Sequence, residues 1–90
     1  MAQSPANGWH VYMLRCRDGT LYTGIARDVE RRLEAHQSGA AAKYTRARRP
    51  VALVYREPQP DRSRALKREV ALRRLGRAGK LALIAANPTE

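Results

Sequence analysis

The chain of 90 residues is long enough for one small domain with one hydrophobic core and too short for a second. Its 18 Lys and Arg residues against 8 Asp and Glu residues give a formal net charge of +10, which favours nucleic acid as the partner over a basic surface that only aids solubility. The single cysteine, Cys16, excludes an internal disulfide and a cysteine-rich zinc site and indicates a reducing compartment.

The ends of the chain show no targeting signal. Residues 1–8 lack the apolar core of a signal peptide, and no run of about 18 apolar residues exists to span a membrane. We therefore expect a cytoplasmic protein that binds no membrane. Its expected parts are a disordered N-terminal tail at 1–8, a single domain at 9–86 and a C-terminal tail at 87–90.

The first expected element is a β-hairpin, because two stretches of strand-forming residues, 9–16 and 21–26, flank an Asp-Gly turn signal. A two-residue turn at the Asp-Gly pair would place Tyr12 and Tyr22 on opposite faces of the hairpin. A three-residue loop with Gly19 in a left-handed conformation brings both rings to one face. We favour this loop because it gives the glycine its usual conformation.

The next expected element is a helix that Asp28 caps, that runs to about Ser38 and that ends at Gly39. At about 100° per residue, Arg32 and His36 fall together on one flank of its inward apolar stripe. Taken alone, each has a plain structural interpretation. An arginine at this position is more often solvated than catalytic. A histidine here is as often a hydrogen-bonded residue at the edge of the core as a catalytic one.

The second half of the chain predicts one strand and two further helices. The expected elements are a helical turn and loop at 42–49, a strand at 51–55, a helix from about 63 to 75 and a last helix from about 78 to 86. Residues 58–61, which include two prolines, should break the chain before the long helix, and Gly76 should end that helix. The order strand, strand, helix, strand, helix, helix describes one α+β unit.

One acidic residue of the long helix falls where apolar residues are expected. Ala65, Leu66, Leu72 and Gly76 share one arc of the helical wheel, and Glu69 lies inside it. A carboxylate that points inward needs an arginine, backbone donors or a metal. A salt bridge is as good an interpretation as a metal on this spacing alone, since a lone carboxylate holds Mg²⁺ only when water and substrate phosphate complete the shell.

Several short motifs, in this order and spacing, resemble the GIY-YIG nuclease domain. Tyr12 and Tyr22 lie in two strand motifs ten residues apart, and the helical stretch 28–33 follows them. Two further motifs, Lys-Tyr-Thr at 43–45 and Arg-Arg-Pro at 48–50, are similar to signatures of a small stand-alone bacterial subgroup whose members are uncharacterised. The resemblance covers residues from about 9 to 84, nearly the whole chain.

This resemblance implies a fold, an activity and a set of site residues. The implied fold is a small three-stranded antiparallel sheet flanked by helices. The implied activity is hydrolysis of a DNA phosphodiester with one divalent cation, Mg²⁺ or Mn²⁺, and no small-molecule cofactor, in DNA repair or recombination. Glu69 matches the metal ligand. The residues that match catalytic positions are Tyr12, Tyr22, Arg32 and His36.

The sequence departs from the family pattern at three points. His10 replaces the glycine of the first motif, and Ile25 stands where excision-repair members carry a lysine. No asparagine aligns with the late one of homing members. The general base must therefore act without the lysine cation or use the charge of Arg27 in its place.

A basic stretch with an aromatic residue predicts the nucleic-acid contacts. The expected binding residues are Arg27, Lys43, Tyr44, Arg46, Arg48 and Arg49. A DNA endonuclease is the first hypothesis, and a non-catalytic nucleic-acid-binding module of the same fold is the alternative. RNA as the partner, and a protein partner that supplies targeting, both remain open.

Overall fold

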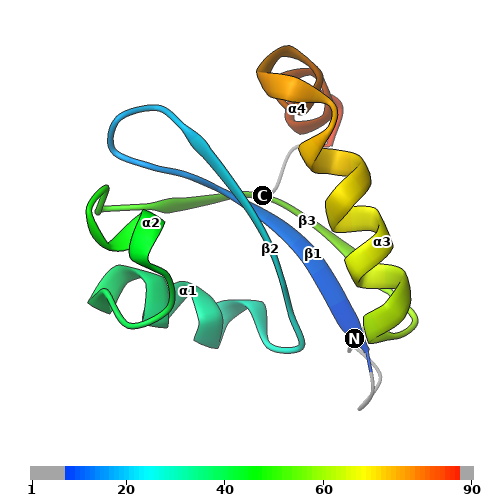
Figure 1. Ribbon diagram of the computed structural model, residues 1–90, viewed down its shortest axis with the longest axis horizontal. Helices are drawn as coiled ribbons and strands as arrows, with labels where there is room; N and C mark the ends of the chain where they lie inside the picture. The colour runs from blue at the N-terminus through cyan, green and yellow to red at the C-terminus, as the bar shows by residue number, and fades with distance from the viewer. Residues whose placement is uncertain (1–7, 88–90) are drawn as a thin grey trace.

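The computed structural model describes residues 8–87 and consists of one sheet with helices on both of its faces (Figure 1). Three antiparallel strands form the sheet in the order β2-β1-β3. In chain order the elements are β1 (Trp9–Arg15), β2 (Leu21–Ala26), α1 (Val29–Ser38), α2 (Lys43–Arg46), β3 (Ala52–Gln59), α3 (Arg62–Arg73) and α4 (Gly76–Ala86). The predicted α+β class and the three-stranded sheet are confirmed. The predicted tails lie, except for Gly8 and Asn87, outside the described residues.

The hairpin has the predicted register. Tyr12 pairs with Gly24 and Leu14 with Tyr22, and the connecting loop is closed by the Cys16 amide, which donates to the Thr20 carbonyl at 2.9 Å. Gly19 has φ 86°, as the three-residue loop requires. Because side chains alternate along a strand, this register places both tyrosines on the same face of the sheet.

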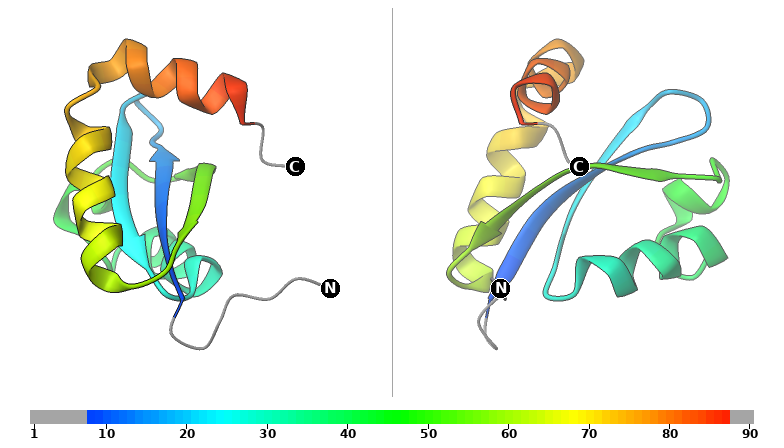
Figure 2. Two further views of the ribbon diagram at one scale, coloured as in Figure 1. Left: turned by 90° about the vertical axis from the view of Figure 1, so that its right-hand side faces the viewer. Right: turned by 180° about the vertical axis from the view of Figure 1, so that it is seen from behind.

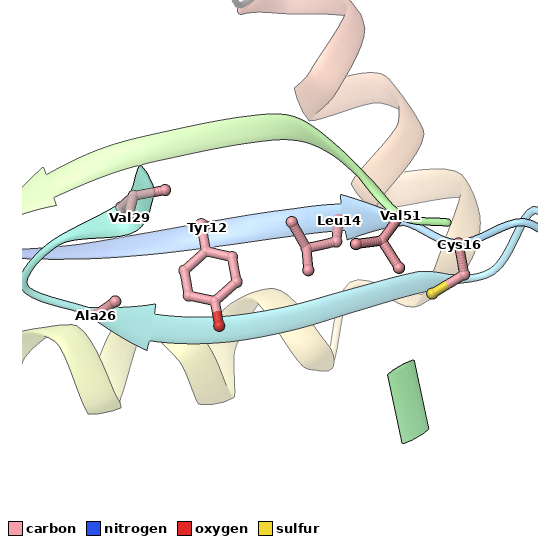
Figure 3. Packing of buried hydrophobic residues seen from close by; sticks show 6 residues of the cluster. All are labelled: Tyr12, Leu14, Cys16, Ala26, Val29 and Val51. Carbon is pink, nitrogen blue, oxygen red and sulfur yellow. The ribbon is translucent and has the colours of Figure 1, made fainter. Parts of the chain in front are cut away.

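The two faces of the sheet pack on different helices. The α1 face carries a buried cluster of Tyr12, Leu14, Cys16, Ala26, Val29 and Val51 (Figure 3). The other face packs on α3 through Val11, Met13, Tyr55, Ala65 and Leu72. Figure 2 shows α1 and α2 on one side of the sheet and α3 on the other. The alternation of buried residues along β1, the central strand, therefore joins both layers into one structure.

Helix α1 begins and ends as the sequence predicts. The Asp28 carboxylate accepts a hydrogen bond from the Arg31 amide at 3.1 Å, and Gly39 ends the helix with φ 86°. Val29 is buried on the inner side, and so is His36, which sequence reasoning placed only at the flank of the core.

Two predicted boundaries are wrong. Strand β3 does not end at residue 55 but continues to Gln59, with Pro58 opposite His10. This is tolerated because β3 is an edge strand, where a proline need not donate to a neighbouring strand. Helix α3 starts at Arg62 and ends at Arg73, and Gly76, with φ 73°, begins α4 instead of ending α3.

Candidate functional site

The first feature of the site is the close approach of Tyr12 to Gly24 in the neighbouring strand β2. A Cβ atom at Gly24 would lie 2.7 Å from Oη and 2.8 Å from Cζ of Tyr12. The ring can lie against the β2 backbone only because residue 24 has no side chain. Figure 3 shows the phenol directed across β2, which is an edge strand, so the hydroxyl is carried to the border of the sheet.

A buried chain of hydrogen bonds continues from Tyr12 into the protein. The Tyr12 hydroxyl lies 2.8 Å from His36 Nε2, and His36 Nδ1 lies 2.8 Å from Thr45 Oγ1. The Thr45 hydroxyl also reaches the carbonyl of Ala42, at 3.2 Å. All three side chains are buried, so α1 and α2 together fix the orientation of a polar chain that starts on β1.

The environment of this chain keeps both ionisable groups neutral. Burial, with the nearby Tyr22 and Glu69 adding to it, raises the pKa of Tyr12, while Arg32 acts in the opposite direction. Burial and then the Arg32 cation lower the pKa of His36 below its ordinary value. Near neutral pH, Tyr12 is therefore a phenol and His36 an uncharged imidazole.

Aromatic rings connect the buried histidine to the surface. The Tyr22 ring packs edge to face on His36, with ring centroids 5.1 Å apart, and stacks on Tyr44 at 6.0 Å. The guanidinium carbon of Arg48 lies 3.9 Å from the Tyr44 centroid. Tyr12 and Tyr22 thus face the same histidine, as their common sheet face predicts, and Tyr22 is the more accessible of the two.

Arg32 lies on the α1 side of the tyrosines. Its cation acts on the pKa of both Tyr12 and His36, so its charge is close to the hydrogen-bonded chain. The side chain is exposed and, with Arg27 and Arg31, lines a cavity of about 270 Å³ at the start of α1. Arg27, predicted to bind nucleic acid, therefore lies beside Arg32 and not with residues 43–49.

Glu69 approaches the tyrosines from α3, on the opposite face of the sheet. Its side chain is 15 % exposed, and Oε2 accepts a hydrogen bond at 3.0 Å from Nη2 of Arg73, one helical turn later. Nη2 of Arg73 also donates to the carbonyl of Thr23 in β2, at 3.3 Å. Both interpretations drawn from the sequence remain compatible with this geometry, since the carboxylate is largely shielded and has an arginine partner.

The residues fit a divalent cation only in a site with one protein carboxylate. Within residues 8–87, no group of three or more His, Cys, Asp and Glu side chains could hold a metal ion. Mg²⁺ tolerates such a site because it keeps several waters and takes oxygens from substrate phosphates. The Arg73 contact is made by Oε2 of Glu69, and the carboxylate has a second oxygen available for a ligand.

The basic segment from 43 to 49 plays a clear structural part. Arg48 Nε forms an ion pair with Asp18 of the hairpin loop at 3.1 Å, and Arg49 donates to the carbonyls of Arg46 and Gln37. These contacts tie α2 to the hairpin and to α1. Lys43 and Arg46 are exposed, and Tyr44 is 38 % exposed, so the segment also presents charge to solvent.

Sequence reasoning missed three participants. Thr45 belongs to the Lys-Tyr-Thr motif but was assigned no role, and its position nine residues after His36 does not indicate a contact. Gly24 lies in the predicted strand at 21–26, and a glycine inside a strand is a known sign of a close approach by another group. Arg73 could have been paired with Glu69 from its i,i+4 spacing, which places the two side chains on the same face of a helix.

The fold agrees with comparisons to known proteins. The GIY-YIG catalytic domain matches residues 8–82. UPF0213 proteins of Xanthomonas axonopodis pv. citri and Desulfotalea psychrophila are 51 % and 52 % identical, over 89 % and 88 % of this chain and 78 % and 73 % of theirs. A UPF0213 protein of Staphylococcus saprophyticus is 49 % identical over 83 % of this chain and 92 % of its own.

A solved structure shows the same arrangement. The solution NMR structure of a UPF0213 protein from Bacillus halodurans superposes with a TM-score of 0.59 at 40 % identity, over 90 % of this chain and 86 % of that one. The fold and the family match thus define a small α+β domain of nuclease type. The chain belongs to the GIY-YIG catalytic domain family, among its small stand-alone UPF0213 members. None of the helices within residues 8–87 is long and apolar enough to cross a membrane.

Proposed function

We propose that this protein is a metal-dependent nuclease that hydrolyses phosphodiester bonds in DNA, in repair or recombination in the cytoplasm. The observation that carries the proposal is the convergence of Tyr12, Tyr22 and Arg32 from one side of strand β2 with Glu69 from the other. A protein that only binds DNA gains nothing from a shielded carboxylate facing an anionic backbone. The net charge of +10 supports a polyanionic substrate.

The hydrogen-bonded chain supplies the proton acceptor that a phenol alone does not. A threonine hydroxyl has one proton, and when it is donated to the Ala42 carbonyl, the Thr45 oxygen accepts from Nδ1–H of His36. Nε2 of His36 then carries a lone pair and accepts the hydrogen bond from Tyr12. Tyr12 can take a proton from water while its own proton passes to Nε2, which converts His36 to an imidazolium.

Substrate would make this transfer easier. Arg32 lowers the pKa of His36 through its positive charge, and a bound phosphate opposes that charge. The basicity of His36 therefore rises when a phosphodiester is bound. In this proposal Tyr22, which is more accessible, orients the attacking water, and Arg32 stabilises the charge that develops on the phosphorus oxygens.

Glu69 is the residue that would hold a Mg²⁺ or Mn²⁺ ion. When bound, that ion supplies neutralisation of the charge on the leaving oxygen. Arg73 holds the carboxylate toward strand β2, because Nη2 of Arg73 donates both to Glu69 and to the Thr23 carbonyl.

One observation favours a second candidate, a nucleic-acid-binding module without catalysis. The Arg73 contact already neutralises the charge of Glu69, as a purely structural ion pair would. Under this alternative, the basic surface binds DNA or RNA and a protein partner directs it. Under this alternative, Mg²⁺ or Mn²⁺ would change neither the stability of the protein nor its affinity for nucleic acid beyond the general effect of salt.

A cleavage assay with a matched control separates these functions. The substrates are duplex, nicked, flapped and branched DNA with Mg²⁺ or Mn²⁺, beside EDTA. We expect cleavage by the wild-type protein, none by Glu69→Gln, and full activity in Glu34→Gln, which removes an exposed carboxylate from α1. Metal-independent binding without cleavage of any of these substrates would favour the binding module instead.

A further inference from the structure

Two adjoining cavities follow the edge of strand β2 beyond Tyr22. The larger has a volume of about 310 Å³, the smaller about 210 Å³, and they share Leu21 and Lys80. The larger is lined by Leu21, Tyr22, Thr23, Tyr44, Arg73 and Lys80. The smaller is lined by Thr20, Leu21, Gly76, Arg77 and Lys80. We call this pair of cavities the β2 groove. It begins at a tyrosine of the candidate site and ends near the hairpin loop.

The α3–α4 corner carries the positive charges of the β2 groove. Arg73 is at the end of α3, and Arg77 and Lys80 are on α4, which passes over the end of the hairpin in the left view of Figure 2. Nη1 of Arg77 donates to the Gly19 carbonyl at 2.7 Å, so α4 is held against the hairpin loop. The shape of the groove thus depends on Gly76, whose positive φ turns the chain from α3 into α4.

The charged side chains that line the β2 groove are all positive, which favours binding of an anion. No carboxylate lines either cavity, and Lys80 has no ion-pair partner among the residues that the structure describes. Lys80 is half-buried, and burial together with the neighbouring Arg73 cation lowers its pKa. Two like charges held together at a partly desolvated site repel each other, and an anion placed between them removes that repulsion.

The aromatic wall at one end indicates what kind of polyanion fits. Tyr22 and Tyr44 form that wall, with Tyr44 38 % exposed, and the cations continue from it along one path. A positively charged groove with aromatic rings beside it is typical of sites for unpaired nucleic acid, where the bases stack on the rings. Cavities of about 310 and 210 Å³ in a row can each take part of a single strand.

We propose that the β2 groove binds an unpaired DNA strand on one side of the bond to be cut, with Arg73, Arg77 and Lys80 on its phosphates. The inference rests on the proposed function only in placing the cleaved bond at Tyr12 and Tyr22. It assigns the substrate class: DNA with an unpaired strand next to the cleavage point, such as a flap or a gapped end. The segment 43–49 then contributes through Tyr44 more than through Arg48 and Arg49, because Tyr44 lines the larger cavity and the two arginines line neither.

Binding measured in EDTA tests the groove without any cleavage. The probes are a fluorescein-labelled oligothymidylate, an oligouridylate RNA with the same label, a 5′-flapped duplex and a blunt duplex, read by fluorescence anisotropy over a range of salt. The test proteins are Lys80→Gln and the double variant Arg77→Gln/Lys80→Gln. The control is Lys67→Gln, which removes one exposed charge from α3 away from both cavities.

We expect the double variant to lose at least about tenfold in affinity for the unpaired strand. For the double variant, the slope of log K against log salt concentration should become less steep by about 1.4, since each phosphate contact to a single strand contributes about 0.7. Lys80→Gln alone should reduce the slope by about half as much, and Lys67→Gln should leave the slope unchanged. Melting curves that match wild type show that the variants are folded.

Three results would overturn the inference: an unchanged salt slope in both test proteins, an equal loss on the blunt duplex, or tighter binding of oligouridylate RNA than of DNA. A wild-type protein that binds through the groove but cuts nothing would count against the nuclease proposal alone. A wild-type protein that cuts, with groove variants that cut flapped and blunt DNA as wild type does, would count against the groove alone.

Discussion

The Tyr12 hydroxyl and His36 Nε2 lie 2.8 Å apart, although 24 positions separate the two residues in the chain. One comes from the central strand and the other from α1. The bond exists because Gly24 lets the phenol ring lie against strand β2 and because Thr45 fixes the far side of the imidazole. Each of these conditions can be removed by a single substitution, which makes the arrangement testable.

Thr45→Val should remove the hydrogen bond between His36 Nδ1 and the side chain of residue 45 while keeping the shape of that side chain. The substitution leaves Nδ1–H of His36 buried without an acceptor, which should cost about 1–3 kcal/mol of stability. Cleavage should fall by at least about tenfold, part of the roughly 10²–10⁴-fold that a positioned base contributes.

The control for this prediction is Thr45→Ser, which keeps the hydroxyl and should restore cleavage. The 15N NMR signals of His36 give an independent readout, since wild type should show the proton on Nδ1 and Thr45→Val should lose that preference. Equal cleavage by the Val and Ser variants would contradict a role for the hydroxyl in orienting His36.

Gly24→Ala should disturb the site from the opposite side. The added Cβ would lie 2.7 Å from the Tyr12 oxygen, so the ring must move and its bond to His36 must lengthen or break. Overpacking of this kind costs about 1–3 kcal/mol of stability.

A double-mutant cycle of Gly24→Ala with Tyr12→Phe measures how the two substitutions are coupled in their effect on the cleavage rate. If Gly24→Ala acts through the Tyr12 hydroxyl, the double variant should be no slower than Tyr12→Phe alone, whereas additive losses would show a separate effect.

The stability of the protein should fall as the pH is lowered through the histidine range. Burial lowers the pKa of both His10 and His36, so the unfolded chain binds more protons than the folded one. The contribution of the two neutral histidines to the free energy of unfolding is therefore complete above the unfolded pKa of about 6.5. It is lost as the pH falls from there through the lower pKa values of the folded state. Urea unfolding at pH 7.5 and 5.5 measures this. His36→Gln should flatten the dependence, and an unchanged slope in that variant would show that His36 does not contribute to it.

The sequence predicts local features well. Asp28, Gly19 and Gly39 each determine their own turn or cap through chemistry confined to a few neighbours, and all three act as expected. The β3 boundary failed because pairing with β1 outweighs the local signal of Pro58 at an edge strand.

The candidate site was predictable only in outline. The residues with a recognisable chemistry, such as Tyr22 and Glu69, stand out from their spacing, and the family resemblance supports them. Thr45 and Lys80 do not, because their roles depend on which helix packs beside which strand. A hydrogen bond between elements distant in sequence has no local signal, so contacts of this kind require the tertiary structure.

Glu69→Gln should abolish cleavage while leaving the fold nearly as stable as wild type. The change keeps the size of the side chain and removes the charge that a divalent cation needs. A large loss of stability would be expected if the partner were a buried arginine, but the Arg73 side chain is 57 % exposed and its cation can be solvated when the pair is lost. We therefore expect the free energy of unfolding to change by at most about 1 kcal/mol, as for other ion pairs open to solvent.

Arg73→Gln is the control variant for this prediction, since it breaks the same ion pair and leaves the carboxylate in place. If Glu69 serves as a metal ligand, Arg73→Gln should retain Mg²⁺-dependent cleavage that Glu69→Gln lacks, at equal melting temperatures. Equal loss of cleavage in both variants, with both proteins folded and with DNA binding equal to that of wild type, would show that the ion pair itself is what the reaction needs.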